Sequence, residues 1–187
     1  MLKITGGKLR GSKLQVPDQI VRPTSAIKRE ALFSKIEDLS LKYSIEIYKN
    51  KCILDLFAGS GSIAFEAISR GIEYAQLYEI DSNIIRIIKK NALKLKLSNI
   101  KINKVDLLNY KNFNIKFDAS IVFIDPPYSL KPFSKIMQVL QKNKNITHET
   151  IIVIETNDNN DKIFKDGFKI LDKKKYGKSF LIYIVKK

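Results

Sequence analysis

The stretch Leu54–Gly71, LDLFAGSGSIAFEAISRG, decides the fold. It begins as the end of a short apolar run that only Asp55 interrupts, which is typical of a strand covered on both faces. Gly59, Gly61 and Ala64 then match the pattern G-x-G-x-x-G/A at a strand-to-helix turn. The first glycine permits the tight turn, the second lets a ligand approach the backbone, and the small third residue lets the helix pack on the strand. The stretch therefore predicts a buried strand, a glycine turn and a helix.

Acidic residues stand at the ends of the next predicted strands. A second strand, 74–78, leads directly into Glu79, twenty positions after Gly59, where a ribose-binding acid is expected. A third strand, 99–103, leads to Asp106. The glycine pattern alone is also compatible with an ordinary strand-to-helix turn, but the acids favour a nucleoside-cofactor site at the carboxyl edge of a parallel sheet. NAD and S-adenosylmethionine both fit at this point.

The rest of the chain alternates predicted strands with predicted helices. Such alternation, ending in a hairpin, predicts one doubly wound α/β sheet with helices on both faces. An antiparallel last strand beside the fifth would distinguish the methyltransferase variant of this architecture from the dinucleotide-binding one. We expect strands at 52–57, 74–78, 99–103, 116–124 and 150–155, helices at 82–97 and near 133–141, and a two-stranded hairpin within 168–187.

The first helix is expected to begin at Thr24 or Ser25, either of which can cap it. Its apolar residues recur at helical spacing and form one stripe, whereas Lys28, Arg29 and Lys35 lie off that stripe. The predicted stripe consists of Ile27, Ala31, Leu32, Ile36 and Leu39. This pattern predicts an amphipathic helix that packs on the sheet through the stripe.

Residues 1–17 are basic and rich in turn residues. Gly6 and Gly7 can form a hairpin turn, and a frayed basic tail is the simpler alternative. We favour an ordered β-hairpin because apolar residues are interleaved with the glycines, in contrast to a simple run of charge. Its cations would then contact phosphates. The cations are Lys3, Lys8, Arg10 and Lys13, and the apolar residues are Leu9, Leu14 and Val16.

The formal net charge of +15 is large for a chain of 187 residues. It suggests a polyanionic partner, with RNA or DNA ahead of an acidic membrane surface. Much of the excess is lysine in a composition rich in isoleucine, lysine and asparagine, which codon bias in an AT-rich genome would also produce. Neither a transmembrane run nor a signal peptide is apparent, so we expect a cytoplasmic protein without membrane contact. Nothing in the sequence demands a partner subunit, and we expect a monomer.

The chain has one cysteine, Cys52, and one histidine, His148. This pair can form neither an intrachain disulfide nor a metal site of the zinc type. Cys52 lies within the first predicted strand and is expected to be a buried structural residue. His148 lies in a connection between a helix and a strand, where we expect it at the surface. The sequence therefore predicts no bound metal.

The tetrad Asp125-Pro126-Pro127-Tyr128 follows the strand expected beside the first one, across the switch point of the sheet, so it faces the glycine turn. An exocyclic amine of a nucleobase is a poor nucleophile because its lone pair is delocalised into the ring. Acceptors at its two N–H groups redirect that lone pair: Asp125 supplies a carboxylate and Pro126 a fixed carbonyl, while Tyr128 supplies a stacking face. Catalysis then rests on alignment and charge compensation, without a strong base. The simpler alternative is a rigid turn that ends a strand.

Together these motifs resemble those of the RsmD family, bacterial methyltransferases that act on a guanine N2 amine of small-subunit ribosomal RNA. The resemblance covers nearly the whole chain in the same order. Its N-terminal part is the most specific, whereas many amino-methyltransferases share the glycine turn and the tetrad. The matching segments are 6–14 (GGKLRGSKL), 22–24 (RPT) with Arg29-Glu30 and Leu32-Phe33, 55–61 (DLFAGSG), 79–81 (EID) and 125–128 (DPPY).

The resemblance implies a Rossmann-like class I methyltransferase fold, mostly parallel with an antiparallel C-terminal strand, plus a small N-terminal β-hairpin and helix. Residues 1–187 would form a single domain. Within it, residues 1–40 would be an extension that covers the cofactor and contacts RNA, and residues 50–187 the catalytic core. The implied cofactor is S-adenosylmethionine, and the implied partner is ribosomal RNA or an assembly intermediate of the small ribosomal subunit.

The resemblance also implies a role for each matching residue. Asp125, Pro126, Pro127 and Tyr128 would hold the guanine. The cofactor would be bound by Asp55, Phe57, Ala58, Gly59, Ser60 and Gly61 around its methionine end, by Glu79 and Ile80 at its ribose, by Asp106 and Leu107 at its adenine, and by Thr24 in the covering segment. RNA would be contacted by Lys8, Arg10, Lys13, Arg22 and Arg29.

Three alternatives remain open from the residues. An adenine-N6 methyltransferase acting on DNA or RNA fits the tetrad equally well, and only the N-terminal segment argues against it. An NAD oxidoreductase fits the glycine turn but has no use for the tetrad. A non-catalytic RNA-binding or assembly factor fits the charge, although a dead site would be expected to lose at least one of Gly59, Gly61, Glu79 and Asp125.

Overall fold

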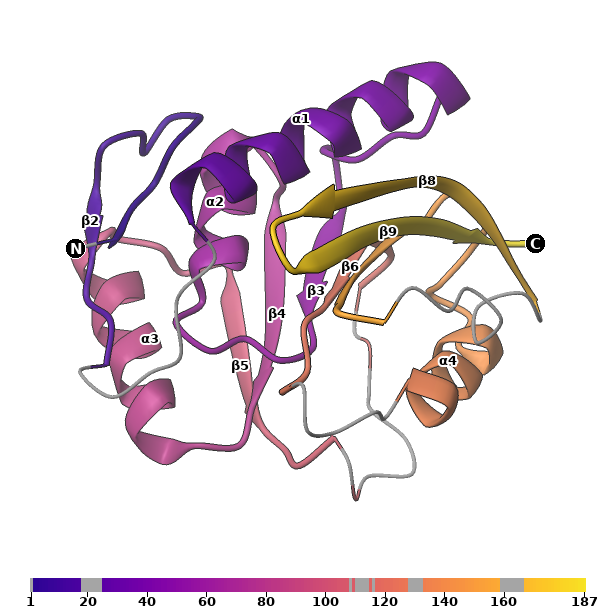
Figure 1. The fold of residues 1–187 in the computed structure, drawn as a ribbon. Coiled ribbons are helices and arrows are strands. Elements are labelled where there is room, and N and C mark those ends of the chain that lie inside the picture. Colours follow the sequence, from indigo (N-terminus) through magenta and orange to yellow (C-terminus); the bar gives the residue numbers. More distant parts are fainter. Residues whose placement is uncertain are drawn as a thin grey trace.

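A mixed sheet of seven strands lies at the centre of the structure (Figure 1). The computed structural model describes residues 2–17, 25–107, 109, 115, 117–127, 133–158 and 167–187. In spatial order the strands are β5 (Ile100–Lys104), β4 (Tyr74–Glu79), β3 (Cys52–Asp55), β6 (Ala119–Ile124), β7 (Ile151–Thr156), β9 (Ser179–Lys186) and β8 (Phe168–Tyr176). The first five are parallel, and β9 pairs antiparallel with both β7 and β8. The prediction of a mostly parallel sheet with an antiparallel C-terminal strand is confirmed.

β3 is the switch point of the sheet: the strands that follow it in sequence are added first on one side of it and then on the other. This strand pairs with β4 on one side and with β6 on the other. From there the sheet continues to β5 in one direction and to β7 in the other. All residues of β3, β6 and β7 are buried, as expected for parallel strands covered on both faces. At such a switch point the loops after neighbouring strands diverge, which leaves room for a ligand at the carboxyl edge.

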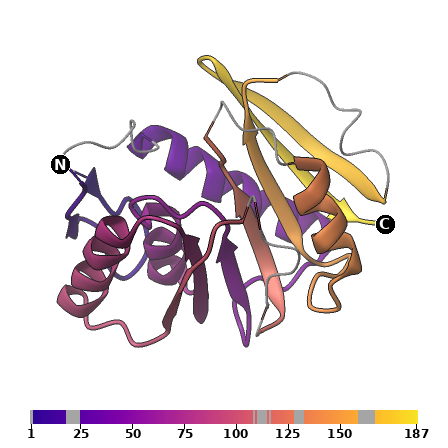
Figure 2. The ribbon, with the colours of Figure 1, turned by 90° about the horizontal axis from the view of Figure 1, so that it is seen from below.

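Helices cover both faces of the sheet (Figures 1 and 2). The helices α1 (Ala26–Tyr43), α2 (Ser62–Arg70) and α3 (Ser82–Lys94) contribute to one buried apolar cluster, and α4 (Phe133–Lys142) contributes to the other. Because side chains alternate along a strand, Ile53 faces the first three helices while Cys52 and Leu54 face α4. The predicted burial of Cys52 is confirmed. None of the helices in the described ranges is both long and apolar enough to cross a membrane.

The N-terminal segment forms the expected β-hairpin, beside α2 and α3 (Figure 1). β1 (Leu2–Lys3) pairs antiparallel with β2 (Lys13–Leu14), and apolar side chains from both strands join the cluster of α1 to α3. The reversal of the chain differs from the prediction. Backbone hydrogen bonds place it between residues 7 and 12, and not at Gly6-Gly7.

Glu66 of α2, which is fully buried, anchors this hairpin. Its carboxylate accepts hydrogen bonds from the backbone N–H groups of Thr5 (2.8 Å) and Gly6 (2.7 Å) and from the Thr5 hydroxyl (2.7 Å). Nε of Arg70 lies 3.0 Å from one carboxylate oxygen, and Nε of Arg29 lies 3.8 Å from the other. A buried carboxylate is tolerated when it is paired and hydrogen-bonded in this way. Groups of the protein itself therefore order the hairpin.

Helix α1 departs from its predicted stripe at two positions. Arg29, predicted to lie off the stripe and to contact RNA, is only 1% exposed. It donates a hydrogen bond to the carbonyl of Lys3 (2.5 Å) and pairs with Glu66. Ile27, predicted to be part of the stripe, is 80% exposed. A buried ion pair thus occupies a core-facing position, and Arg29 is a structural residue in place of the predicted RNA contact.

The remaining bounds differ from the predictions at element ends. The first long strand ends at Asp55 and not at Phe57, because the next residues begin the glycine turn. The strand predicted for 116–124 begins at Ala119. The helix predicted for 82–97 ends at Lys94, where the backbone N–H of Leu95 closes the last turn on Asn91. Helix ends and strand ends fray, so pattern alone locates them less well than the elements themselves.

Gly7→Ala is expected to detach the N-terminal hairpin, whereas Gly11→Ala is not. Both glycines have a left-handed φ, +74° and +83°, so both substitutions carry the same backbone strain of about 1–2 kcal/mol. A Cβ at Gly7 would overlap the Ser69 carbonyl, whereas a Cβ at Gly11 would have nothing within 4 Å. Amide hydrogen exchange should therefore accelerate across residues 2–15 in the Gly7 variant alone. Equal acceleration in both variants would mean that backbone strain, and not the close approach, governs docking.

Candidate active site

Three carboxylates converge on the carboxyl edge of the sheet, at its switch point. Asp55 ends β3, Glu79 ends β4, and Asp125 directly follows β6. Parallel pairing places the end of β3 between the ends of the other two strands. The charges of Asp125 and Glu79 both act on Asp55, where they add to the effect of burial on its pKa. The structure thus brings together three of the four acids that the sequence singled out.

The glycine turn faces this edge, but its two glycines have other roles than expected. Gly61 has φ +72° at the start of α2, and a Cβ there would lie 3.1 Å from the ring of Phe65. The second glycine therefore serves packing inside the protein. A Cβ at Gly59, with φ +49°, would meet nothing closer than the Phe57 carbonyl at 4.0 Å. The open space that we predicted at the second glycine lies at the first. Ala64 is fully buried, as its predicted role in helix packing requires.

The Glu79 carboxylate is fixed against the glycine turn by three backbone N–H groups. One oxygen accepts from Gly59 (2.9 Å), and the other accepts from Ile80 (2.8 Å) and Asp81 (2.9 Å). A carboxylate has about four acceptor positions, so this arrangement leaves room for a further donor such as a hydroxyl. Glu79 is half-buried and therefore reachable. The side chain is held in place before any ligand arrives.

Asp55 is a buried carboxyl group whose charge is poorly compensated, since the backbone N–H of Phe57 lowers its pKa only slightly against the other effects. It is 1% exposed, and neither of its side-chain oxygens has a hydrogen-bond partner among the described residues. Burial, together with repulsion from Asp125 and Glu79, raises its pKa to about 8. Leaving a buried polar group unpaired costs free energy, and such groups concentrate at functional sites. Asp55 is thus suited to a ligand that brings a positive charge or hydrogen-bond donors.

Asp125 lies at the same edge in a less enclosed position. Burial, and then the charge of Glu155, raise its pKa to about 7, while the charge of Lys28 lowers it. Near neutral pH both the acid and the carboxylate are therefore populated. The following Pro126 is buried and Pro127 is exposed. The carboxyl group can act there as a hydrogen-bond acceptor whose charge responds to its surroundings.

Sequence reasoning missed a polar cluster beside Asp125. Lys28 of α1 pairs with Glu155 of β7, and its ammonium donates to the Ser179 hydroxyl (2.8 Å) at the start of β9. The Ser179 hydroxyl in turn lies 3.2 Å from the same Glu155 oxygen. This cluster ties the start of α1 and the C-terminal hairpin to the carboxyl edge of the sheet. One signal was available: Glu155 is a carboxylate near the end of a buried strand adjacent to that of Asp125.

The loop after β5 brings two further predicted residues to this edge. The N–H of Val105 donates to the carbonyl of Glu79 (3.1 Å), so the chain enters the loop beside the ribose-binding candidate. Asp106 accepts a hydrogen bond from the Asn109 amide (2.6 Å), and Leu107 is buried. Ile80, next to Glu79, is 56% exposed, which leaves an apolar surface at the rim.

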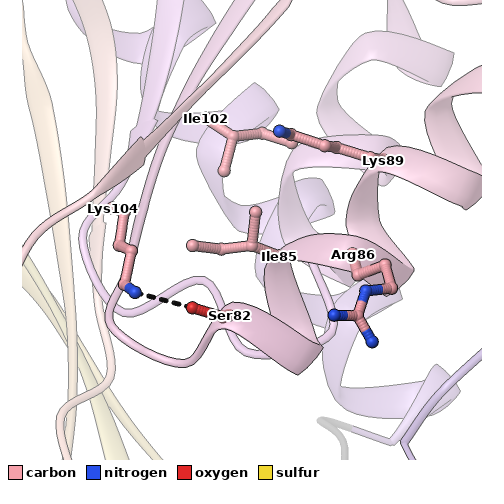
Figure 3. Close-up of a pocket in the computed structure, with 6 residues that line it drawn as sticks. All are labelled: Ser82, Ile85, Arg86, Lys89, Ile102 and Lys104. Atoms are coloured by element: carbon pink, nitrogen blue, oxygen red, sulfur yellow. Dashed lines mark hydrogen bonds between the residues drawn. The ribbon is translucent and has the colours of Figure 1, made fainter.

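A hollow of about 340 Å³ lies between α3 and β5 (Figure 3). It contains none of the predicted site residues. Lys104 donates a hydrogen bond to the Ser82 hydroxyl (2.6 Å) at one end of this hollow. Its lining residues are Ser82, Ile85, Arg86, Lys89, Ile102 and Lys104. Three of these are cations and none is an acid, so the hollow differs in chemistry from the edge that carries the carboxylates.

Several predicted residues do not join this site. The backbone of Lys8 bonds to the carbonyl of Ser69, at the end of α2 remote from the glycine turn. Arg10 and Lys13 belong to the same hairpin, so these cations lie away from Asp125. Arg22, Thr24 and Tyr128 lie outside the described residues. His148 is exposed, as expected, and the described residues hold no group of three side chains that could bind a metal.

Comparison with known proteins identifies the family. The family model described as Conserved hypothetical protein 95 matches residues 2–185. The ribosomal RNA small subunit methyltransferase D of Buchnera aphidicola subsp. Acyrthosiphon pisum is 36% identical over 157 residues, which cover 81% of this chain and 76% of that protein. The Escherichia coli (strain K12) protein of the same name is 33% identical over 159 residues, 83% of this chain and 74% of that one. The chain belongs to the RsmD family.

The fold agrees with this membership. The solved structure of yhhF from Escherichia coli superimposes with a TM-score of 0.80 at 27% identity and covers 100% of this chain and 98% of that chain. The architecture is that of class I methyltransferases, with the antiparallel C-terminal strand that separates them from dinucleotide-binding proteins. The RsmD resemblance inferred from the motifs is therefore confirmed at the level of family and fold.

The residues at the carboxyl edge fit the methyl donor that an RsmD-type class I fold implies. S-adenosylmethionine carries an ammonium group and a sulfonium, and the buried Asp55 carboxyl lacks such a partner. The cofactor also carries ribose hydroxyls, and Glu79 is held with acceptor capacity to spare. The open side of Gly59 provides space without a side chain. The chemistry of these donors and acceptors matches that of the cofactor.

Asp55→Asn is expected to stabilise the protein at neutral pH. Because the pKa of Asp55 is about 8 in the folded state against 3.8 in the unfolded chain, the folded state holds a proton that the unfolded state releases. Wild-type stability therefore falls as the pH rises from about 4 to about 8, by up to about 1.4 kcal/mol per pH unit. Chemical denaturation should show an Asn variant whose advantage grows over this range. The difference in free energy of unfolding between the Asn variant and wild type should exceed that of the exposed Asp118→Asn control. A difference that does not change with pH, or that equals the control, would contradict a raised pKa of Asp55.

Proposed function

We propose that the protein transfers a methyl group from S-adenosylmethionine to the N2 amine of a guanine in small-subunit ribosomal RNA. The observation that carries this proposal is the convergence of Asp55, Glu79 and Asp125 on one edge of a class I methyltransferase sheet. Two relatives at 36% and 33% identity are named ribosomal RNA small subunit methyltransferases, which supports RNA as the substrate. Residues 1–40 would be an extension on a catalytic core formed by residues 50–187.

In this proposal the residues around β3 and β4 bind the cofactor. Glu79 accepts hydrogen bonds from the ribose hydroxyls while its three backbone bonds keep it in place. Asp55, with the backbone of residues 58–61, surrounds the methionine end, and the positive charge there favours the ionised form of Asp55. Ile80 lies next to Glu79 at the ribose, and Asp106 and Leu107 flank the adenine. The bound cofactor supplies an activated methyl group on a sulfonium.

Asp125 and its neighbours orient the amine in this proposal. The Asp125 carboxylate accepts one N–H of the guanine amine, and the Pro126 carbonyl accepts the other, which directs the nitrogen lone pair toward the methyl group. As the new N–C bond forms, the amine becomes more acidic and loses a proton, which the Asp125 carboxylate can accept. Tyr128 would provide the stacking face for the base. The contributions of the chain are thus alignment and acceptance of a proton.

A methyl-transfer assay tests the proposal directly. Labelled cofactor is offered with naked small-subunit ribosomal RNA, partly assembled small subunits and genomic DNA, and the digested nucleosides are identified by mass spectrometry. N2-methylguanosine from an RNA substrate is the expected product. N6-methyladenine from any substrate would keep the cofactor site and replace the proposed base. Binding of the cofactor without any transfer would keep the cofactor site and overturn ribosomal RNA as the substrate, whereas failure to bind the cofactor would favour a non-catalytic RNA-binding factor.

Asp125→Ala should abolish transfer while cofactor binding survives. The substitution removes the acceptor for the amine, so we expect kcat to fall by about 100-fold or more. Isothermal calorimetry should give a Kd for S-adenosylmethionine within about threefold of wild type, because Asp125 does not hold the cofactor in this proposal. Glu79→Ala is the matched counterpart and should weaken cofactor binding first. Loss of both properties in Asp125→Ala would identify Asp125 as a folding residue.

The rate should depend on pH through Asp125. Only the carboxylate accepts the amine hydrogen, and its pKa in the free protein is about 7. We therefore expect kcat/KM, which reports ionisation of the free enzyme, to rise with pH across that value. In Lys28→Met the rise should move to higher pH, since the charge of Lys28 lowers the pKa of Asp125. A profile that is flat, or that moves to lower pH in this variant, would rule out Asp125 as the titrating acceptor.

A further inference from the structure

We propose that the tip of the C-terminal hairpin, residues 173–180, binds the phosphate backbone of the RNA substrate next to the guanine site. This inference rests on the proposed function and assigns the RNA-contacting surface, which lies away from the N-terminal cations that the motifs suggested. The hairpin tip is the turn between β8 and β9, together with the residues that flank it. Strand direction, charge and aromatic contacts support the assignment independently.

Strand direction brings the hairpin tip to the catalytic edge. Asp125 follows β6, whose last residue, Ile124, pairs with Ile154 of β7. Because β9 runs antiparallel to β7, it begins where β7 ends, and Thr156 pairs with Phe180. Strands are about 4.8 Å apart, so β8 lies about 14 Å across the sheet from the strand that carries Asp125. An RNA chain whose target base is held at Asp125 would reach the tip within a few nucleotides.

The tip is strongly basic. It carries Lys173, Lys174, Lys175 and Lys178, and the last three are exposed. The acid that precedes them, Asp172, is engaged with Lys35 of α1 at 3.1 Å. Within the described part of the chain, Lys174, Lys175 and Lys178 form no ion pair. The charge of Lys174 also lowers the pKa of Asp38 on α1 without forming an ion pair. Exposed ammonium groups outside ion pairs are the groups that neutralise phosphates and release counterions.

An aromatic ring organises two of these cations. The ammonium groups of Lys173 and Lys175 lie 5.0 Å and 5.9 Å from the centroid of the Phe180 ring. Lys175 and Phe180 are direct partners across the hairpin, so the arrangement follows from the register. The ring itself is half-buried against the apolar cluster on the α4 side. The Phe180 ring thereby holds the two ammonium groups side by side, although their like charges repel one another.

The N-terminal hairpin lies elsewhere. Helix α2 begins at the glycine turn and extends about 14 Å, and the N–H of Lys8 bonds to Ser69 near its far end (2.7 Å). The ammonium of Lys94, at the far end of α3, bonds to the carbonyl of Lys13 (2.9 Å). Figures 1 and 2 show this hairpin (indigo) beside α2 and α3, and the β8–β9 hairpin (yellow) on the other side of the molecule. The cations of the N-terminal hairpin are therefore remote from Asp125.

Two triple variants with the same loss of charge test the assignment. One replaces Lys174, Lys175 and Lys178 with Ala, and the matched control replaces Lys8, Arg10 and Lys13. Binding of naked small-subunit ribosomal RNA is measured by salt titration with the full chain. The hairpin-tip variant should bind about 10-fold or more weakly at low salt and lose about 2 from the slope of log K against log salt concentration. The control should show less than half of this change, and both should keep the wild-type melting temperature and cofactor Kd.

Each other outcome overturns the assignment. An unchanged salt slope in the hairpin-tip variant, or a loss in the control that equals or exceeds it, would move the RNA contact elsewhere. A defect seen with assembled subunits but not with naked RNA would identify a protein partner. A different result would contradict the proposed function, namely that the wild-type protein methylates no ribosomal RNA. Normal wild-type methylation with unchanged RNA binding by the hairpin-tip variant removes only the hairpin assignment.

Discussion

The pairing of β3 between β4 and β6 is the constraint on which the site depends. Both pairings are parallel, so the three strands end at one edge and bring Asp55, Glu79 and Asp125 together. Three acids at one edge repel one another, and the backbone offsets this unevenly. Glu79 receives three N–H groups, whereas neither oxygen of Asp55 has a hydrogen bond of ordinary geometry among the described residues, and the backbone N–H of Phe57 lowers its pKa less than burial and the neighbouring charges raise it. Ionisation is therefore least favourable at Asp55, and a cationic ligand bound there would favour its carboxylate form.

Two buried carboxyl groups in this molecule illustrate what separates a structural acid from a candidate for ligand binding. Glu66 is as deeply buried as Asp55, but it accepts hydrogen bonds from Thr5 and Gly6 and pairs with Arg70. The fold has satisfied Glu66 completely, and the result is a docked N-terminal hairpin. The side-chain oxygens of Asp55 have no such partners among the described residues, although every residue of its strand is buried. Burial alone is thus uninformative, and the count of partners indicates which acid awaits a ligand.

Local patterns predicted the sheet, the helices and the three acids, because alternation and turn residues act over short stretches of chain. They failed where the deciding partner is distant in sequence. Arg29 reads as a surface residue of α1, since helical periodicity counts apolar residues and cannot anticipate Glu66. The role of Gly61 depends on Phe65 and Ile88, which the glycine pattern does not include. The cluster of Lys28, Glu155 and Ser179 joins three elements, and the position of Glu155 near a strand end is its only local signal.

The same reasoning explains why charge in the sequence does not locate the proposed RNA surface. Both terminal hairpins are basic, and charge alone gives no reason to prefer either. Their positions differ because β9 enters the sheet antiparallel to β7, which places the β8–β9 turn at the edge that carries Asp125. A parallel last strand would place its preceding turn at the opposite edge. The antiparallel strand that distinguishes this architecture from dinucleotide-binding folds is therefore also what brings lysines beside the site, so topology and electrostatics are linked here.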